Sequence, residues 1–473
     1  MITLGVVFEV LKGRQPSWAD QIIADVGIDS RKLIPGSMFV ALVGESADGH
    51  DFVKDAFDRG ASFALIDRPV DPGIRVIDLR SDFDVDLDQE LEVPFCLLVD
   101  DALTALQQVA GAWRDKLDIR VIGITGSVGK STTKELTATV LKQRYRTLKN
   151  PGNLNNEIGL PMTLWRLGEG HQRAVLEMGF YVPGEIEFLC GLARPSVGVI
   201  TTIGTVHAER AGSQEEIARG KAELVKALPP APEGTAILNY DDPLVRNMAG
   251  DTDARVFYYG LSPEADLWAD EVEGLGLDGI RFRLHYRGES IHLKVPLIGR
   301  HSVHTVLRAA AVGLIEGLSW EEISWGLRSE HTQLRLVAVR AKSGAMILDD
   351  TYNASPKSML ADLNLLEEMV GRKVAVLGDM LELGLYEEQG HRKVGIRAAE
   401  VSDVLITVGE LGQLIAQAAA AAGFKAERLH SFIDSDEAIQ FLKGFLKEQD
   451  VVLVKGSRGM RMDKIVAALE TDS

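Results

Sequence analysis

The chain has 473 residues, of which 46% are hydrophobic and 25% charged, and its formal net charge is -18. This composition is typical of a globular protein, and the length predicts two or three domains. The negative charge argues against a nucleic-acid partner. Because the N-terminus lacks a signal-peptide pattern and no apolar run reaches membrane-spanning length, we expect a cytoplasmic protein without membrane insertion.

The cysteines indicate a reducing compartment. Cys96 and Cys190 lie in apolar segments and lack the spacing of metal ligands. Cysteines in such surroundings usually act as small buried side chains. We therefore expect no disulfide framework.

Residues 1–103 predict a small α/β domain. Short apolar runs at 37–43 and 61–67 are separated by turn-rich segments, and an acidic stretch covers 78–92. Such runs are typical of strands, and the charge run is typical of an exposed loop. A helix is expected at 102–117.

The most informative segment is an apolar strand at 121–125 that runs into a glycine-rich turn ending in Lys-Ser-Thr. Gly126 and Gly129 let the backbone curl with its N–H groups turned inward, and a helix beginning near Lys130 points its positive end at an anion. Lys130 can reach terminal phosphates, and the Ser131 hydroxyl suits Mg²⁺. The predicted nucleotide-phosphate site comprises Gly126, Ser127, Val128, Gly129, Lys130, Ser131 and Thr132.

After this loop, apolar strands are each followed or ended by a polar residue. The strands are expected at 174–178, 197–203 and 236–239. Apolar runs that alternate with helices predict a parallel sheet, whose ligands bind at the carboxyl ends of its strands. We therefore expect Glu177, His207 and Asn239 to converge on the nucleotide in a central domain at 104–330. The alternatives are a solvated acid at Glu177 and an ordinary loop histidine at His207.

The string Gly274–Gly279 matches the dinucleotide fingerprint G-x-G-x-x-G, but its context is wrong. The flanking segments 280–286 and 290–295 alternate like antiparallel strands, and no helix follows the glycines. We interpret this segment as turns near a β-hairpin.

A second open α/β sheet is expected at 331–473. Apolar runs at 345–349, 373–377, 404–408 and 451–455 are separated by helical patterns and end in polar or glycine residues. This alternation is typical of a Rossmann-like domain. The predicted fold class is therefore α/β, with three domains in a row: a small N-terminal domain, a central P-loop sheet and a C-terminal Rossmann-like domain.

Four further motifs carry a family resemblance: Asn153–Gly159, Asp350–Pro356, Leu377–Gly384 and Lys455–Arg458. Together with the phosphate loop, they resemble the Mur ligases, ATP-dependent enzymes that form amide bonds in peptidoglycan synthesis. The resemblance spans nearly the whole chain. It is strongest to the members that join D-alanyl-D-alanine to UDP-N-acetylmuramoyl-tripeptide, so these two molecules are the expected partners of a monomeric enzyme.

The resemblance implies a specific chemistry. Such a ligase transfers the γ-phosphate of ATP to a carboxylate, and an amine then attacks the acyl phosphate. Because both steps crowd anionic oxygens together, the site needs Mg²⁺ and fixed cations. The resemblance places Lys130 on the β- and γ-phosphates, Ser131 and Glu177 on one Mg²⁺, and His207 on a second.

Lys221 matches the position at which related ligases carry a carbamylated lysine. A free ammonium would be repelled by Mg²⁺, whereas a lysine carbamate is an anion that can ligate metal or orient the acyl phosphate. The alternative is a solvated helix lysine.

The resemblance also distributes the substrate contacts. Five residues match segments that bind the uridine diphosphate end of the substrate: Ser30, Arg31, Asp48, Gly49 and His50. The amides of Asn153, Asn155 and Asn156 would contact the peptide stem or muramoyl group, or else simply form a turn.

On the C-terminal side, Arg335 resembles an arginine that binds the γ-phosphate, Asp350 the acid that binds the ATP ribose, and His301 a residue of the nucleotide site. Ser302 and Thr305 stand where the family usually has asparagines near adenine, so the adenine contacts there remain open. The acids of Gly378–Gly384 either serve the site or brace a loop. The dipeptide and nucleotide side of the cleft is expected to include Tyr352, Asn353, Lys455, Ser457 and Arg458.

Two kinds of rival function remain. The first is another carboxylate–amine ligase, such as a different amino-acid-adding Mur ligase or a folylpolyglutamate synthase. The second is a nucleotide-binding switch protein, which is disfavoured because the chain has no Asn-Lys-x-Asp guanine-reading motif.

Overall fold

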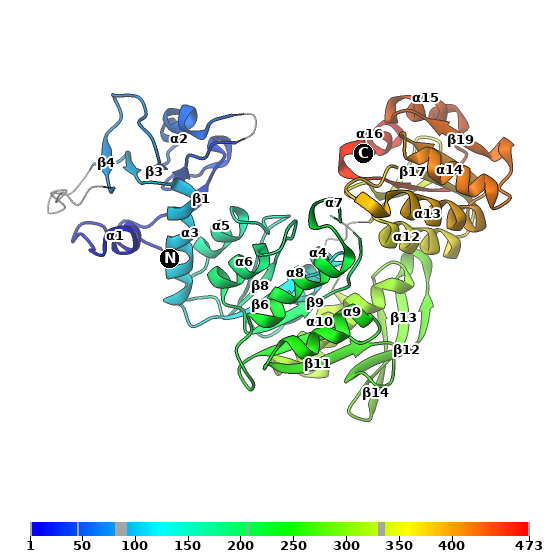
Figure 1. Cartoon of the computed structure of the whole chain (residues 1–473), viewed down its shortest axis with the longest axis horizontal. Helices are drawn as coiled ribbons and strands as arrows, with labels where there is room; N and C mark the ends of the chain where they lie inside the picture. Colours follow the sequence, from blue (N-terminus) through cyan, green and yellow to red (C-terminus); the bar gives the residue numbers. More distant parts are fainter. Residues whose placement is uncertain (1, 45–46, 81–91, 206–207, 330–335, 472–473) are drawn as a thin grey trace. The chain divides into compact units, whose positions relative to one another are not determined.

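The computed structural model describes residues 2–44, 47–80, 92–205, 208–329 and 336–471 (Figure 1). The predictions for His207, Arg335 and most of the acidic loop therefore concern residues outside the described ones. Two compact units are present. The first comprises Met1–Gly123, Tyr145–Gly179 and Gly184–Val197, and the second comprises Ile124–Arg144, Phe180–Pro183 and Gly198–Ser473.

The first unit contains a five-stranded sheet in the order β1-β2-β3-β5-β4, with every neighbouring pair parallel. Its strands are β1 (Val26–Gly27), β2 (Met38–Val40), β3 (Phe63–Ile66), β4 (Val76–Asp78) and β5 (Phe95–Leu98). One face packs on α2 (Val53–Asp58) through a core that includes Phe39, Val53 and Cys96. This sheet confirms the expected N-terminal α/β fold.

The helix expected at 102–117 is α3 (Ala102–Asp115), whose first turn is capped by the Asp101 carboxylate. It packs against α1 (Leu4–Lys12), α5 (Gly159–Trp165) and α6 (Glu185–Ala193). The same unit contains the parallel pair β7 (Thr147–Lys149) and β8 (Arg173–Glu177). Cys96 and Cys190 are both buried and free, as their surroundings predicted.

The second unit begins with the end of β6 (Arg120–Thr125) and α4 (Lys130–Leu141). Its strands β10 (Thr235–Asn239), β11 (Arg255–Gly260) and β12 (Leu267–Gly274) pair in parallel. Its other central elements are β9 (Val197–Ile200), α7 (Ala208–Ala211), α8 (Gln214–Lys226), α9 (Pro243–Arg246), η3 (Asn247–Asp251), η5 (Arg300–Ser302), α10 (Val303–Ile315) and α11 (Trp320–Arg328).

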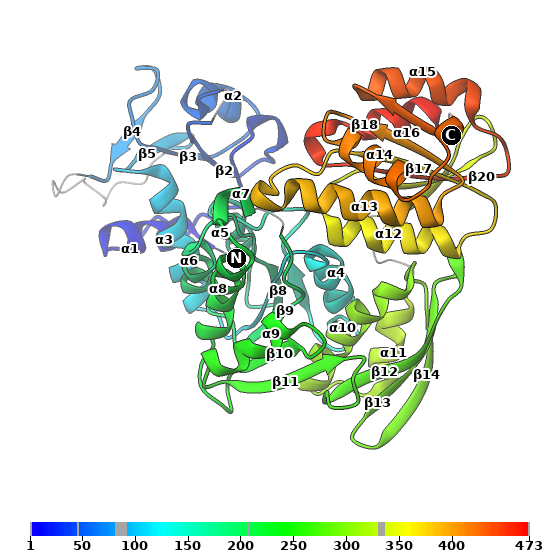
Figure 2. The same cartoon turned by 45° about the vertical axis from the view of Figure 1, so that its right-hand side comes forward.

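The glycine string at 274–279 is confirmed as a turn. It contains the short η4 (Gly276–Asp278), which joins β12 to β13 (Ile280–Tyr286). Strand β13 pairs antiparallel with β12 and with β14 (Glu289–Val295), so no dinucleotide-binding helix follows the glycines. Figure 2 shows these three strands side by side.

The C-terminal sheet has six strands in the order β15-β16-β20-β17-β18-β19. All pairs are parallel except β15 with β16. The strands are β15 (Val337–Arg340), β16 (Met346–Asp350), β17 (Arg372–Gly378), β18 (Val404–Val408), β19 (Leu429–Phe432) and β20 (Asp450–Lys455). The four predicted strands are confirmed, and the two edge strands β15 and β19 are additional.

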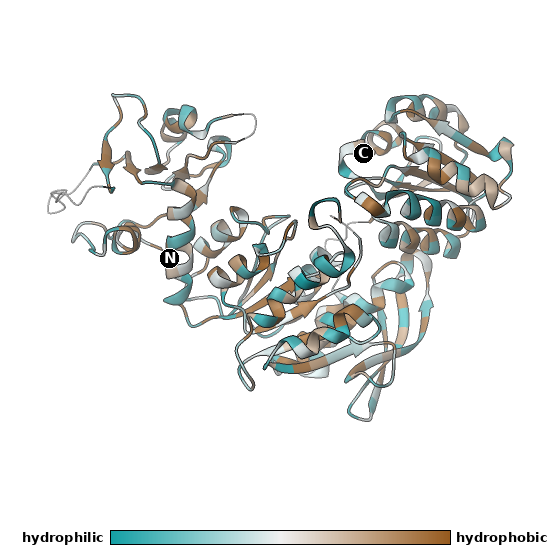
Figure 3. Ribbon diagram, in the orientation of Figure 1, coloured by the Kyte–Doolittle hydropathy of each residue, from teal (hydrophilic) through white to brown (hydrophobic). Residues whose placement is uncertain are grey.

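Helices cover both faces of this sheet, as Figure 1 shows. One apolar core joins the sheet to α12 (Pro356–Glu368), α13 (Glu387–Val401) and α14 (Gly412–Ala421), and the other joins it to α15 (Ser435–Phe445) and α16 (Asp463–Leu469). In Figure 3 the outward faces of α12 and α13 are largely hydrophilic. Accordingly, none of the helices in the described ranges has the length and apolar character needed to cross a bilayer.

Candidate nucleotide-binding site

The phosphate loop has the backbone that its glycines predicted. Gly126 and Gly129 both have positive φ, +140° and +85°. A Cβ atom placed on Gly126 would lie 1.8 Å from Oγ1 of Thr201, so the turn also has no room for a side chain there. Gly129 directly precedes α4, whose first-turn N–H groups have no intrahelical acceptor and favour an anion.

Four hydrogen bonds hold the loop in shape. The Ser127 backbone N–H donates to the Thr202 carbonyl (2.8 Å), and the Ser127 hydroxyl accepts from the Gly204 N–H (2.9 Å). The Thr133 hydroxyl donates to the Gly129 carbonyl (2.6 Å). The Lys130 ammonium donates to the Gly126 carbonyl (2.9 Å), so its positive charge lies across the mouth of the turn.

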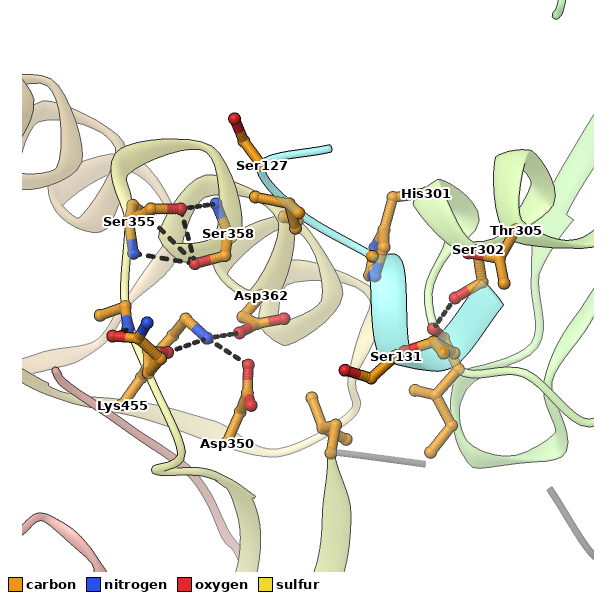
Figure 4. A pocket seen from close by; sticks show the side chains of 18 residues that line it. Ser127, Ser131, His301, Ser302, Thr305, Asp350, Ser355, Ser358, Asp362 and Lys455 are labelled. Carbon is orange, nitrogen blue, oxygen red and sulfur yellow. Dashed lines mark hydrogen bonds and ion pairs between the residues drawn. The ribbon is translucent and has the colours of Figure 1, made fainter. Parts of the chain in front are cut away.

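A pocket opens beside this loop and brings together residues from three parts of the second unit (Figure 4). The phosphate loop contributes 127–129 and 131–132, and the segment around η5 contributes His301, Ser302 and Thr305. The C-terminal sheet and α12 contribute Asp350, Asn353, Ser355, Ser358, Asp362 and Lys455. The predicted residues Asp350, Asn353, Lys455 and His301 thus share one pocket with the loop, whereas Asp362 was missed.

Within this pocket, a lysine is enclosed by oxygens. Lys455 is 1% exposed, and its ammonium contacts the Asp350 carboxylate and lies 2.9 Å from Oδ2 of Asp362. It also donates to the Asn353 carbonyl (3.2 Å). His301 lies nearby, where desolvation and then the positive charge of Lys455 lower the pKa of the imidazole to about 4.

A second pocket adjoins the loop and contains Asn239. The Asn239 amide donates to the Thr201 carbonyl (3.4 Å) and accepts from the Asp241 N–H (3.0 Å), so this side chain shapes the strand end. Nε2 of His304 lies 2.9 Å from the Asp241 carboxylate. Burial alone would raise the pKa of Asp241, but the His304 contact and two backbone N–H donors outweigh it and lower the pKa.

Arg308, which the sequence analysis also missed, lines the second pocket and is 3% exposed. Its guanidinium donates to Oγ1 of Thr305 (2.8 Å) and to the Tyr259 hydroxyl (3.4 Å). The Ser302 hydroxyl donates to the Ile298 carbonyl (2.7 Å). Both side chains that replace the usual asparagines therefore have partners within the protein.

In the first unit, Glu177 lies at the end of β8 and is 1% exposed. Its Oε1 accepts from the Asn155 side-chain amide (2.9 Å), which joins two of the predicted residues. Asn150 donates to the Glu177 carbonyl (3.0 Å) and accepts from the Glu177 N–H (2.9 Å). The role of Asn150 was not predicted, because a single asparagine after a strand carries no recognisable pattern. The side-chain amide oxygen of Asn156 accepts from the N–H of Gly159, the first residue of α5 (2.9 Å).

Lys221 is in the second half of α8 and is 2% exposed, so it is not a solvated helix lysine. Its ammonium lies 4.5 Å from the centroid of the Phe180 ring. A Cβ atom on the neighbouring Gly220 would lie 2.1 Å from that ring, so the helix and Phe180 are in close contact.

The candidate uridine-diphosphate residues form two local clusters in the first unit. The Ser30 hydroxyl donates to Asp55 (2.6 Å), and Arg31 is paired with Asp29 (2.9 Å). The buried His50 lies between two carboxylates, with Nδ1 2.8 Å from Asp48 and Nε2 3.1 Å from Asp67. Gly49 begins η2 (Gly49–Phe52).

The motif at 378–384 braces a loop, at least through its aspartate. Asp379 is buried and accepts from the Gly412 N–H (2.7 Å), and desolvation raises the pKa of its carboxyl. Nε2 of His391 accepts from the Met380 N–H (2.9 Å). Ser457 joins this loop to the motif at 455–458, because its N–H donates to the Asp379 carbonyl (2.9 Å) and its hydroxyl accepts from the Leu381 N–H (2.8 Å).

Tyr352 and Arg458 lie together near that loop. The Arg458 guanidinium is 5.9 Å from the centroid of the Tyr352 ring, and this tyrosine is 40% exposed. An exposed aromatic ring beside a cation can contact a ligand.

Two of the expected magnesium ligands, Ser131 and Glu177, lie among the described residues. Ser131 presents a hydroxyl at the start of α4, and Glu177 presents a buried carboxylate at a strand end. Both are oxygen donors of the kind that Mg²⁺ prefers. Among the described residues, no three His, Cys, Asp or Glu side chains form a metal site.

Comparisons with known proteins agree with this architecture. Three family models match the chain: "Mur ligase family, catalytic domain" at 22–110, "Mur ligase middle domain" at 124–313 and "Mur ligase, glutamate ligase domain" at 334–458. The chain is 37% identical over 473 residues to the UDP-N-acetylmuramoyl-tripeptide--D-alanyl-D-alanine ligase of Bacillus subtilis, covering 99% of this chain and 98% of the relative.

Solved structures give the same result. MurF from Acinetobacter baumannii has a TM-score of 0.82 and 32% identity, with 98% of each chain covered. MurF ligase from Thermotoga maritima in complex with ADP has a TM-score of 0.77 and 26% identity, with 94% of this chain and 96% of that chain covered. By its three-domain α/β fold, its phosphate loop and these similarities, the chain belongs to the Mur ligase family.

Proposed function

We propose that this ligase uses ATP to join D-alanyl-D-alanine to the terminal carboxylate of UDP-N-acetylmuramoyl-tripeptide, a step in peptidoglycan synthesis. The observation that carries this is the pocket where the phosphate loop lies opposite Asp350, Asn353 and Lys455. A relative of 37% identity is named for that reaction, and a related ligase of similar structure was solved with ADP.

In this mechanism the phosphate loop binds the triphosphate. Its inward-turned backbone and the start of α4 offer N–H donors to the phosphates. The Lys130 ammonium, which donates to the Gly126 carbonyl in this structure, would move to the β- and γ-phosphates when the nucleotide binds. Fixed positive groups stabilise the charge that develops as phosphate passes to the substrate carboxylate. We assign Arg335 the same role on the γ-phosphate.

Magnesium would be held by Ser131 and Glu177, and a second ion by His207. When bound, the metal neutralises phosphate oxygens and polarises the phosphorus that is transferred. The hydrogen bond from the half-buried Asn155 to Glu177 holds the carboxylate in a fixed orientation. Lys221, desolvated beside Phe180, is the proposed site of carbamylation.

Substrate recognition is proposed to follow the three domains 1–103, 104–330 and 331–473. The uridine diphosphate end would contact the clusters around Ser30–Arg31 and Asp48–His50, and the stem or muramoyl group would contact Asn153–Asn156. Tyr352, Asn353, Ser457 and Arg458 would line the side of the dipeptide. The Lys455 ammonium is already enclosed by protein oxygens. We therefore propose that Lys455 does not contact the dipeptide itself but holds Asp350 in position.

Product mass tests the proposal. Purified protein, ATP, Mg²⁺ and the muramoyl tripeptide are incubated with and without D-alanyl-D-alanine, and free phosphate is recorded. A pentapeptide product with stoichiometric phosphate release is expected. If a product formed only when a single amino acid replaced the dipeptide, or only when a folate replaced the muramoyl tripeptide, one of the rival ligases would be favoured. If the protein bound the nucleotide but turned over no substrate, a switch protein would be favoured.

A further inference from the structure

Two carboxylates and one ammonium are buried together in the wall of the nucleotide pocket (Figure 4). Asp350 and Lys455 end the neighbouring strands β16 and β20 and are register partners. Asp362 reaches the same point from the middle of α12 and is 4% exposed. The cluster therefore depends on three elements that meet only in the folded protein.

The surroundings of Lys455 show what Asp362 does. An ammonium has three N–H donors, and three oxygens surround this one: those of Asp350, Asp362 and the Asn353 carbonyl. Burial alone would lower the pKa of Lys455, but the two carboxylates outweigh it and raise the pKa, so the lysine stays charged. Asp362 supplies the carboxylate that pairs with the ammonium from the side of α12, with Oδ2 2.9 Å from Nζ of Lys455.

The charges in this cluster do not balance when both acids are ionised. Two carboxylates and one ammonium leave one net negative charge beside the loop that binds an anion. Burial is the largest influence on Asp362, and with the neighbouring Asp350 it outweighs Lys455 and raises the pKa of Asp362 to about 7. Because the two acids interact, the proton belongs to the pair.

Other elements around Asp362 add little charge. The core that α12 shares with α13 and β17 includes the apolar Val394, Ala398 and Leu377. The charged side chain that α13 places on α12 is Arg397, which is paired with Glu367 (2.6 Å) and donates to the Asn364 side chain (2.9 Å). From η5, His301 lines the same pocket and is neutral near pH 7, since its pKa is lowered to about 4. Asp350 and Lys455 are therefore the charged partners that matter.

We propose that Asp362 is a positioning residue of the nucleotide pocket, which holds the Lys455 ammonium against Asp350 and, when it ionises, weakens the binding of an anionic nucleotide. This inference rests on the proposed function and adds a group that controls the affinity of the same site. One proton on the Asp350–Asp362 pair leaves the cluster neutral, whereas ionisation of both acids adds a negative charge. Nucleotide affinity should therefore fall as the pH rises through neutrality.

The test compares wild type with Asp362→Asn, which keeps the shape of the protonated acid but cannot ionise. The probe is AMP-PNP with Mg²⁺, and its binding is measured by calorimetry at several pH values from about 6 to about 8.5. This range lies on both sides of the pKa of about 7 for Asp362. We expect the wild-type Kd to rise about fivefold more than that of the variant, the order of magnitude for one charge several ångströms away in a partly hydrated site. Titration of the nucleotide itself affects both proteins equally.

Asp450→Asn is the matched control, since Asp450 is a buried aspartate at the other end of β20, paired with Arg372. It should keep the wild-type pH slope. If Asp362→Asn does not fold, Asp362→Ala takes its place, and its Kd must likewise rise less with pH than that of wild type. In ligation assays, Asp362→Asn should change KM for ATP and its pH profile while kcat is unchanged.

The inference would be overturned if the Kd of Asp362→Asn for AMP-PNP rose with pH as steeply as that of wild type. It would also be overturned if Asp450→Asn lost this pH dependence to the same extent as Asp362→Asn. Either result would leave the proposed ligase function intact. Wild-type protein that binds AMP-PNP with the expected slope but ligates no acceptor would instead overturn the proposed function alone.

Discussion

The two walls of the nucleotide pocket are built in contrasting ways. The phosphate loop uses contiguous backbone from Gly126 to Thr132, shaped by two glycines with positive φ. The opposite wall uses the charged side chains of Asp350, Asp362 and Lys455, which come from three separate elements. The first wall offers amide donors that do not titrate, whereas the second carries a charge that depends on pH.

This difference separates geometry from charge as determinants of binding. Backbone donors bind phosphate only if the turn keeps its shape, so small steric changes should abolish function. Charged side chains tolerate some movement, so changes there should adjust affinity. Four variants, from the largest expected effect to the smallest, test this contrast.

Gly126→Ala should have the largest effect. The added Cβ would meet Oγ1 of Thr201 at 1.8 Å, and φ of +140° is strained for any side chain. A displacement of the loop by about 1 Å should reduce ligation about 100-fold or more. Gly423→Ala is the control, because Gly423 has φ of +91° with no atom within 4 Å of a Cβ. It should cost on the order of 1 kcal/mol in unfolding free energy and keep activity. Near-normal activity of Gly126→Ala would show that the shape of the turn does not matter.

Lys130→Met tests whether the loop also needs a charge. Its ammonium now lies on the Gly126 carbonyl, from which it can reach the phosphates. Loss of one group that stabilises the transferred phosphate should lower kcat about 100-fold, with an intact fold by circular dichroism. Lys142→Met, at the far end of α4, should retain wild-type kcat. Equal kcat values for the two variants would assign phosphate binding to the backbone alone.

Lys221→Ala examines a buried amine that is not among the residues lining this pocket. If the amine is carbamylated, activity should fall at least about tenfold and recover in part with formate or acetate, which replace the missing anion. Carbon NMR of wild type under labelled CO₂ should show a carbamate signal that Lys221→Ala lacks. Lys226→Ala, on the same helix but half-exposed, should behave as wild type. The carbamate would be excluded if Lys221→Ala lost activity, formate and acetate did not restore it, and the wild type gave no carbamate signal by NMR.

His391→Gln should have the smallest effect and concerns stability. Burial lowers the pKa of His391 from its usual 6.5, so between that value and the folded pKa the unfolded state binds more protons. Stability should therefore decrease as the pH falls below 6.5, by at most about 1.4 kcal/mol per pH unit from this group. The glutamine variant should lose that part of the slope in urea unfolding at several pH values. An unchanged slope would mean that His391 is protonated in the folded protein.

Much of the fold could be predicted because it depends on short-range pattern. The phosphate loop is one contiguous segment, and the parallel strands of the C-terminal sheet are apolar runs such as 451–455. The turn at 274–279 was recognised because alternating strands flank it. The edge strand β15, by contrast, was missed, because three of its four residues are exposed and one is half-buried, so no apolar run marks it.

The parts of the site that escaped prediction depend on long-range contacts. Lys455 meets Asp350 across 105 positions, and no spacing rule links either of them to Asp362 on a helix. Asn150 and Arg308 are likewise ordinary residues in the sequence, and their surroundings are defined only when strands and helices assemble. His207 and Arg335 stay predictions, since they lie outside the described residues.

The hydrogen bonds through Ser457 tie the motif at 378–384 to the motif at 455–458. Beside them, the end of β17 and the residue after β20 approach each other closely, since a Cβ on Gly378 would lie 3.4 Å from the Cα of Gly456 and 3.0 Å from Sδ of Met462. The two motifs therefore form one structural unit, in which neither loop can be replaced without disturbing the other. A chimera that exchanges one of them for the corresponding segment of another ligase must exchange the other as well.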